Sequence, residues 1–264
     1  MKIFVINLKR SKKRRKSIER QLNRLSLKYE LYEAVDGIAW GKDKMSHYIK
    51  KNLIDELPSG HLAASLSHFF LYKQIVENNI HQALILEDDV VLSNDLPEIL
   101  KYLDKHPLNS LEIVLLHMQV LYGAKLLKIG AIHLNVNKSI YYLKPPKGGI
   151  GSGAAYIITK EAAENRLRDF PISFKIDSWV PMMRKGIFEY LRCVYPYPVT
   201  PAFFPSDINY INEESIKHKL KKLANNIPLL AHFLKSQRKE TWISSQQDIE
   251  FSNEEVLPAS ELFK

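Results

Sequence analysis

Three consecutive carboxylates, Glu87-Asp88-Asp89, directly follow the apolar run Ala83-Leu84-Ile85-Leu86. Neighbouring like charges raise one another's pKa and oppose folding, so this acidic cluster predicts a cation nearby. Carboxylate oxygens suit hard divalent ions such as Mg²⁺ or Mn²⁺, which complete their coordination shell with phosphate oxygens and water. A solvated turn ahead of a helix is the alternative explanation. The position directly after a buried strand favours a metal ion and a bound phosphate.

The elements that must position this cluster are apolar strands separated by amphipathic helices. Uninterrupted apolar runs predict buried strands, and apolar residues three or four apart predict helices. These patterns predict strands at 2–8, 29–35, 83–86, 111–117 and 154–158, and helices at 12–25, 60–79, 95–105 and 160–168. Such alternation is typical of an α/β sheet with parallel pairs.

Three segments carry weaker patterns. Residues 38–59 are predicted to form a connecting loop, with a short helix within it as the alternative, and residues 118–150 give only a weak strand signal at Tyr141-Tyr142-Leu143. Residues 171–205 contain six prolines. Because proline disrupts helices and central strands, this segment is predicted to be irregular apart from a short helix near 177–185.

Ligands of α/β sheets bind at the carboxyl ends of the strands. This rule places Asn7 and Leu8, the acidic cluster and the Gly-rich loop from Gly148 to Gly153 around one crevice. Arg14 or Arg15, at the start of the first helix, could meet a phosphate there. The loop lacks the Lys-Ser/Thr of a Walker motif, so a merely flexible loop is the alternative.

The order of several blocks resembles glycosyltransferase family 25, which contains bacterial lipooligosaccharide galactosyltransferases and collagen galactosyltransferases. No single block is specific for the family, but the order of the blocks taken together is. The resemblance continues to about residue 205. It is carried by Ile3–Leu8 with Arg14-Arg15, Ala34–Gly37, Gly60–His68, Leu84–Val90, Gly153–Ile158 and Asp177.

The resemblance implies a GT-A-like, Rossmann-type domain that binds a UDP-sugar, usually UDP-galactose and alternatively UDP-glucose, and transfers the sugar with inversion. It also implies Mn²⁺ or Mg²⁺ at the acidic cluster, with Asp89 and Asp88 as principal ligands and Glu87 in support. Ser67 and His68 match a family signature and would line the donor site together with Gly153. Core packing of His68 is the alternative.

Inverting transfer requires a base that takes the proton of the acceptor hydroxyl. Asp177 is the candidate, and Trp179 beside it could stack on a sugar ring. A helix N-cap is the alternative role of Asp177. The rival functions are a metal-dependent nucleotide-sugar phosphohydrolase and a basic nucleic-acid-binding protein.

The chain carries 38 Lys and Arg against 29 Asp and Glu, a net charge of +9 that favours polyanionic partners. Nucleic acid is not expected, because no RNP, zinc or helix-turn-helix pattern is present. The basic run Lys9–Lys16 instead suggests an anionic membrane surface or a phosphoglycan, with a solvated face as the alternative. Basic amphipathic helices near 216–234 suggest the same membrane surface, with packing onto the domain as the alternative. Residues 1–210 are predicted to form the catalytic domain and 211–264 a basic, partly helical C-terminal extension.

The cellular location is predicted from cysteine content and hydropathy. Cys193 is the single cysteine, which excludes an internal disulfide and a cysteine-based zinc site and favours a reducing compartment. No run approaches the roughly 18 apolar residues of a transmembrane helix. We therefore expect a peripheral protein at the cytoplasmic face of a bacterial inner membrane, acting on a lipooligosaccharide or lipopolysaccharide acceptor.

Overall fold

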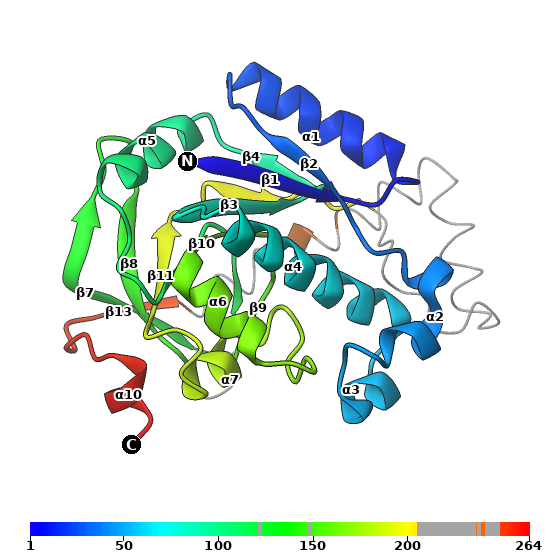
Figure 1. Cartoon of the computed structure of the whole chain (residues 1–264). Helices are drawn as coiled ribbons and strands as arrows, with labels where there is room; N and C mark the ends of the chain where they lie inside the picture. The colour runs from blue at the N-terminus through cyan, green and yellow to red at the C-terminus, as the bar shows by residue number, and fades with distance from the viewer. Residues whose placement is uncertain (121–122, 147–148, 205–235, 237–238, 241–248) are drawn as a thin grey trace.

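The computed structural model describes residues 1–264 apart from 121–122, 147–148, 205–235, 237–238 and 241–248. Its centre is a mixed sheet of nine strands in the order β13-β7-β8-β11-β5-β10-β3-β1-β2 (Figure 1). These strands are β1 (Lys2–Asn7), β2 (Glu30–Glu33), β3 (Gln82–Glu87), β5 (Glu112–Leu115), β7 (Ala124–His133), β8 (Ser139–Lys144), β10 (Ala155–Thr159), β11 (Tyr190–Tyr195) and β13 (Ile249–Ser252).

Two small sheets and a set of helices surround the main sheet. β4 (Val90–Leu92) pairs with β12 (Val199–Pro201), and β6 (Gln119–Val120) pairs with β9 (Ile150–Gly151). The described helices are α1 (Lys12–Arg24), α2 (Gly37–Met45), α3 (Lys51–Glu56), α4 (Ser59–Glu77), α5 (Leu96–Lys105), α6 (Lys160–Arg168), α7 (Trp179–Arg184) and α10 (Ala259–Leu262).

Strand direction determines which residues meet at one end of the sheet. β1 pairs in parallel with β2 and β3, as the alternation of elements predicts. β10 runs antiparallel between β3 and β5, so β3 and β5 point the same way. The carboxyl ends of β1, β3 and β5 and the amino end of β10 therefore lie together.

The side chains of the central strands alternate between two cores. Phe4 and Ile6 share a core with residues of α4, α6 and α7, whereas Ile3 and Val5 share one with α1 and α5. All four are at most 6% exposed, and burial of each such side chain stabilises the fold by roughly 1.5–3 kcal/mol. The protein is thus a three-layer α/β structure (Figure 1), which confirms the predicted α/β class.

Two segments contain more regular structure than their sequence patterns predict. The stretch 38–59 holds most of α2 and all of α3, and a kink at Gly41, with φ 66°, obscures the helical pattern. The irregular prediction for 171–205 was wrong at β11, which pairs with both β5 and β8. Pro196 follows the last residue of β11, so it ends this strand rather than interrupting it.

The described C-terminal segment joins the main sheet. β13 pairs in parallel with β7, and Ala259 of α10 is buried in the core. The basic helices predicted near 216–234 fall outside the described residues, and the domain boundary at 210 stays a prediction. Across the part of the chain that the structure describes, no helix combines the length and apolarity needed to cross a bilayer.

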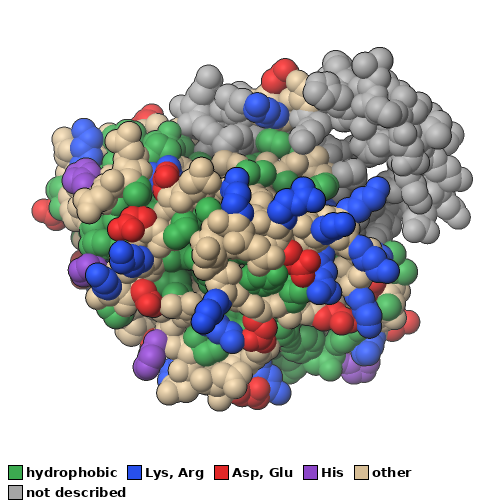
Figure 2. Space-filling model, turned by 90° about the horizontal axis from the view of Figure 1, so that it is seen from above, with side chains coloured by type: hydrophobic (Ala, Val, Ile, Leu, Met, Phe, Trp, Pro, Cys, Tyr) green, Lys and Arg blue, Asp and Glu red, His purple; other side chains and the backbone are tan. Residues whose placement is uncertain are grey.

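Basic side chains gather on the face of the molecule that α1 covers (Figure 2). Arg14 is the exception among the basic residues of α1, because its side chain is only 9% exposed and points inward. The exposed basic residues of α1 are Lys12, Lys13, Arg15, Lys16, Arg20 and Arg24.

Candidate functional site

The last residue of β1 contacts the acidic cluster at the end of β3. Asn7 Nδ2 donates to Oδ2 of Asp88 at 2.6 Å, and Asn7 is buried. Arg14, from the first turn of α1, donates to Oδ1 of Asp88 at 3.2 Å and lies 3.1 Å from Oδ2 of Asp89. The predicted convergence of Asn7, Arg14 and the acidic cluster is therefore present.

A pocket opens beside these contacts, at the carboxyl ends of β1 and β3. One part of its wall is polar or charged, and another part consists of small residues from α4 and the start of α2. The lining residues are Ile6, Leu8, Arg14, Ala34, Val35, Gly37, Gly60, Ala63, Ala64, Ser67, His68, Glu87 and Asp88. Leu8, Arg14, Ser67, His68, Glu87 and Asp88 are among the residues that the sequence predicts for the site.

Negative charge is in excess within the acidic cluster. Burial raises the pKa of Asp88, although the Arg14 guanidinium and the Asn7 amide oppose that shift. Burial, and then the carboxylate of Glu87, raise the pKa of Asp89 to about 7. One guanidinium thus compensates only part of the charge of three neighbouring carboxylates.

The donor atoms of this cluster fit a hard divalent ion. They are carboxylate oxygens, which Mg²⁺ and Mn²⁺ prefer, and their excess charge favours a cation. Asn7 and Arg14 already hold Asp88, so Glu87 rather than Asp88 would join Asp89 as a principal ligand, whereas the sequence predicts Asp89 and Asp88 in that role. Among the described residues no three His, Cys, Asp or Glu side chains converge on one point, so substrate or water oxygens would complete the shell.

Ser67 and His68 of α4 both line the pocket, but their polar atoms are used differently. Ser67 Oγ accepts from the backbone N–H of Val35 at 2.8 Å and donates to a carbonyl one turn earlier at 2.7 Å. This hydroxyl therefore ties the end of β2 to α4. His68 Nδ1 lies 2.7 Å from the hydroxyl of Tyr156, and Nε2 lies 3.6 Å from Oε1 of Glu87.

The Gly-rich loop lies between two carboxylates. A Cβ atom at Gly153 would lie 3.8 Å from Oε1 of Glu87, and a Cβ atom at Gly151 would lie 3.5 Å from Oδ2 of Asp177. Asp177 is partly exposed, and Ser178 rather than Asp177 occupies the N-cap position of α7. The structure therefore brings Gly153 and Asp177 to the same side of the molecule as Glu87.

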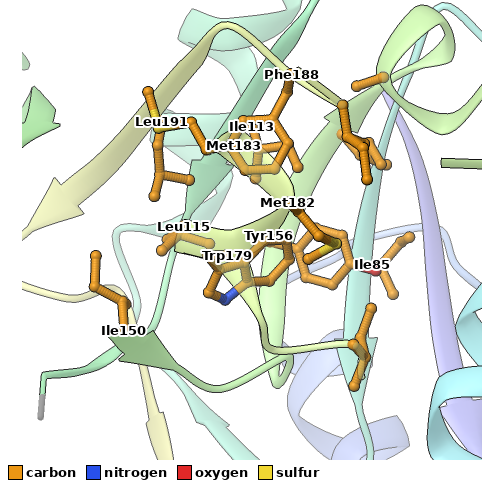
Figure 3. Close-up of a cluster of buried hydrophobic side chains, with 14 of the residues drawn as sticks. Ile85, Ile113, Leu115, Ile150, Tyr156, Trp179, Met182, Met183, Phe188 and Leu191 are labelled. Atoms are coloured by element: carbon orange, nitrogen blue, oxygen red, sulfur yellow. The ribbon is translucent and has the colours of Figure 1, made fainter. Parts of the chain in front are cut away.

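Arg15 and Trp179 do not point toward the pocket. Arg15 is exposed, and its Nε pairs with Oε1 of Glu19 at 3.0 Å on the outer face of α1. Trp179 is 1% exposed, and its Nε1 donates to the carbonyl of Ser152. Its ring packs against Tyr156 in the core (Figure 3). The prediction that Trp179 stacks on a sugar was wrong, because its ring is buried and its Nε1 hydrogen-bonds to the Gly-rich loop.

Gly37 lines the pocket and His61 lies near Asp177 and Glu87, although both are expected from the sequence only as members of motif blocks and not as site residues. Burial lowers the pKa of His61, while the carboxylates of Asp177 and Glu87 oppose that shift, so His61 lies within the electrostatic reach of both. A histidine on an apolar helix has no distinguishing sequence pattern. Gly37 allows α2 and α4 to approach, because a Cβ atom there would lie 2.6 Å from the carbonyl oxygen of Ser59.

Comparisons with known proteins show which family the chain resembles. Residues 1–179 match the family model described as "Glycosyltransferase family 25 (LPS biosynthesis protein)". This stretch contains β1, the acidic cluster, Gly153 and Asp177.

Individual relatives match over different shares of the chain. Procollagen galactosyltransferase 1-A of Xenopus laevis is 25% identical over 242 residues, which are 80% of this chain and 37% of the relative. Procollagen galactosyltransferase 2 of Mus musculus is 33% identical over 96 residues, 33% of this chain and 15% of the relative. A glycosyltransferase 25 family member of Aedes aegypti is 30% identical over 96 residues, 33% of this chain and 16% of the relative.

The chain thus spans well under half the length of these relatives. The family model, in contrast, covers most of the chain, including both strands that carry the pocket. The protein belongs to glycosyltransferase family 25.

Proposed function

We propose that this protein transfers galactose from UDP-galactose to a glycan acceptor with inversion at the anomeric carbon. UDP-glucose is the alternative donor. The observation that carries the proposal is the excess of carboxylates, anchored through Asn7 and Arg14, where β1 and β3 end. α/β proteins bind nucleotides at such strand ends, and two of the relatives are named galactosyltransferases.

The acidic cluster is assigned to the diphosphate side of the donor. Glu87 and Asp89 would hold Mn²⁺ or Mg²⁺, with Asp88 in support. When bound, such an ion offsets the negative charge that develops on the departing diphosphate. Arg14 adds a buried guanidinium at the same place, where it can donate to phosphate oxygens.

Asp177 is assigned to the acceptor side as the base. It would take the proton of the acceptor hydroxyl while that oxygen attacks the anomeric carbon and UDP departs. The Gly-rich loop separates Asp177 from Glu87, so proton removal and charge stabilisation fall to different carboxylates. Leu8, Ser67, His68 and Gly153 would border the bound donor between them.

The acceptor is proposed to be a lipooligosaccharide or lipopolysaccharide at the cytoplasmic face of a bacterial inner membrane. The family description names lipopolysaccharide biosynthesis. The exposed basic residues of α1 would attract phosphorylated glycans or anionic lipid. Nucleic acid is not among the proposed partners.

The test is a panel of UDP-sugars assayed for thermal stabilisation with and without Mn²⁺, followed by measurement of UDP release. We expect UDP-galactose to raise the Tm by several degrees only with the metal, since a ligand that binds the folded state stabilises it. UDP release should then require a lipooligosaccharide acceptor. Asp89→Asn should abolish it, whereas Asp55→Asn, an exposed control on α3, should not.

Other outcomes would identify the rival functions. UDP release at the same rate without acceptor would mean that the protein is a nucleotide-sugar phosphohydrolase. Salt-dependent DNA binding without any stabilisation by UDP-sugars would mean that it binds nucleic acid. Full activity of Asp177→Asn would eliminate the assigned base.

A further inference from the structure

Three buried polar side chains form a chain that leads from the core to the acidic cluster. The hydroxyl of Tyr72 lies 2.6 Å from the hydroxyl of Tyr156, which lies 2.7 Å from Nδ1 of His68. The residues Tyr72, Tyr156 and His68 are 2%, 0% and 1% exposed. Burial of a hydroxyl in an apolar core is unfavourable unless its proton finds an acceptor, so this arrangement requires an explanation.

One direction of hydrogen bonding satisfies both hydroxyl protons. If Tyr72 donates to Tyr156 and Tyr156 donates to Nδ1 of His68, each proton has an acceptor. In the opposite direction the proton of Tyr72 has no acceptor among the described residues. Burial raises the pKa of Tyr72 to about 12 and also raises that of Tyr156, so both hydroxyls keep their protons.

The favoured direction determines the tautomer of His68. A neutral imidazole that accepts at Nδ1 carries its proton on Nε2. This Nε2 is buried and has no hydrogen-bond partner among the described residues, but it lies 3.6 Å from Oε1 of Glu87. The rings of His68 and Tyr156 stack with centroids 5.7 Å apart, which restricts rotation of the imidazole.

We propose that Tyr72 and Tyr156 hold His68 as the Nε2–H tautomer and that this N–H orients the Glu87 carboxylate in the pocket. His68 is then a positioning residue that acts through Glu87. A separation of 3.6 Å is too long for a hydrogen bond, and such bonds often shorten only when substrate binds. The inference rests on the proposed function, because that proposal gives Glu87 its role.

The tautomer can be measured without any activity. In protein labelled with ¹⁵N-histidine, at about pH 8 where model imidazoles are neutral, nitrogen shifts and couplings report which ring nitrogen carries the proton. The missing signal in His68→Gln assigns the resonances. We expect Nε2–H in the wild type and a mixture of tautomers in Tyr156→Phe. An Nδ1–H or doubly protonated His68 in the wild type would overturn the proposal.

Kinetics then test the effect on Glu87. His68→Gln keeps an N–H donor near the position of Nε2, whereas His68→Met keeps bulk without a donor. We expect His68→Met to lower kcat about tenfold or more with little change in the acceptor KM, as supporting residues of metal ligands do, and His68→Gln to recover most of that loss. Equal losses in the two variants would show that His68 acts only through packing and would overturn the proposal.

A control variant tests whether the loss of any hydrogen-bonded tyrosine hydroxyl has the same effect. Tyr142→Phe removes a partly buried hydroxyl of β8 that accepts from Arg192 of β11, several strands from the pocket. We expect this variant to keep the wild-type kcat while Tyr156→Phe does not. If the wild type transfers no sugar, the proposed function fails, and the tautomer measurement still decides this inference.

Discussion

Asp88 and Asp89 are adjacent in the sequence, yet their surroundings differ. Asp88 is buried and accepts from Asn7 and Arg14, so it joins β1, α1 and β3. Asp89 is more exposed and contacts Arg14 but not Asn7. At the scale of single residues, we therefore infer that Asp88 is mainly an anchor and that Asp89 is mainly a ligand.

Stability measurements should separate these two roles. Asp88→Ala leaves Asn7 and Arg14 without their shared acceptor, so we expect the free energy of unfolding to fall by about 2–3 kcal/mol. Asp89→Asn removes one of three crowded negative charges. We therefore expect the free energy of unfolding to increase slightly in metal-free buffer at about pH 8. Urea denaturation of both variants checks this. A similar loss of stability in both would contradict the assignment.

His117, which follows β5, should make stability depend on pH. Burial lowers its pKa from 6.5 to about 4. Because the unfolded state binds the proton more readily, stability is fully present above about pH 6.5 and falls as the pH drops toward 4. This difference in pKa corresponds to roughly 3 kcal/mol.

The measurement is the free energy of unfolding at several values between pH 7.5 and 4.5, spanning roughly the two pKa values. Wild type should lose more stability over this interval than His117→Leu, which cannot gain a proton. Parallel curves for the two proteins would exclude His117 as a source of the pH dependence.

At the scale of elements, the pocket depends on the close approach of α2 to α4. Gly37→Ala would place a Cβ atom 2.6 Å from a backbone oxygen of Ser59, so one helix must move. We expect a loss of about 1–3 kcal/mol in stability and a higher KM for the donor, because Gly37 lines the pocket. Ile38→Ala, at an exposed neighbour, is the control and should change neither quantity.

Elements with strong local patterns could be predicted from the sequence. β1, β3 and α4 have apolar runs or helical spacing. Because parallel strands end at the same edge of a sheet, Asn7 could be predicted to lie beside the acidic cluster, as it does. β11 was missed because the six prolines of 171–205 favoured an irregular segment, although its own residues, Tyr190–Tyr195, include aromatic and β-branched side chains that suit a strand. Its pairing with β5 and β8 is not visible in the local sequence.

Contacts between side chains far apart in the sequence could not be predicted either, because they depend on how the elements pack together. The bond between His68 and Tyr156 joins residues 88 positions apart and depends on the packing of α4 against β10. Trp179 was predicted to meet a sugar because an aromatic ring beside a carboxylate suits that role, but burial assigns it to the core. Which face of an element is covered is decided by the whole fold.

At the scale of the whole molecule, the chain has a net charge of +9, and exposed basic residues lie along α1 on the face shown in Figure 2. We expect binding to vesicles rich in anionic lipid at low salt and release at high salt, because screening weakens such attraction. Replacing Lys12, Lys13 and Lys16 by Glu should weaken vesicle binding by about 100-fold or more, at about 1 kcal/mol for each lost charge contact.

The control is a charge reversal of equal size elsewhere on the surface. Lys73, Lys128 and Lys185 are exposed and lie outside α1. Their replacement by Glu gives the same net charge, so a similar loss of vesicle binding would mean that total charge, rather than the α1 face, drives the attraction. Sedimentation with vesicles measures both variants.

The reversed direction of β10 has a consequence for protein engineering. Because β10 runs antiparallel between β3 and β5, β5 ends and β10 begins at the same end of the sheet, beside the acidic cluster, and the residues between them add β7 and β8 to the same sheet. The intervening residues could be exchanged between family members as one module, while β1, β3 and the acidic cluster stay in place. Such chimeras must also carry a compatible β11 and β13, since β7 and β8 pair with these strands.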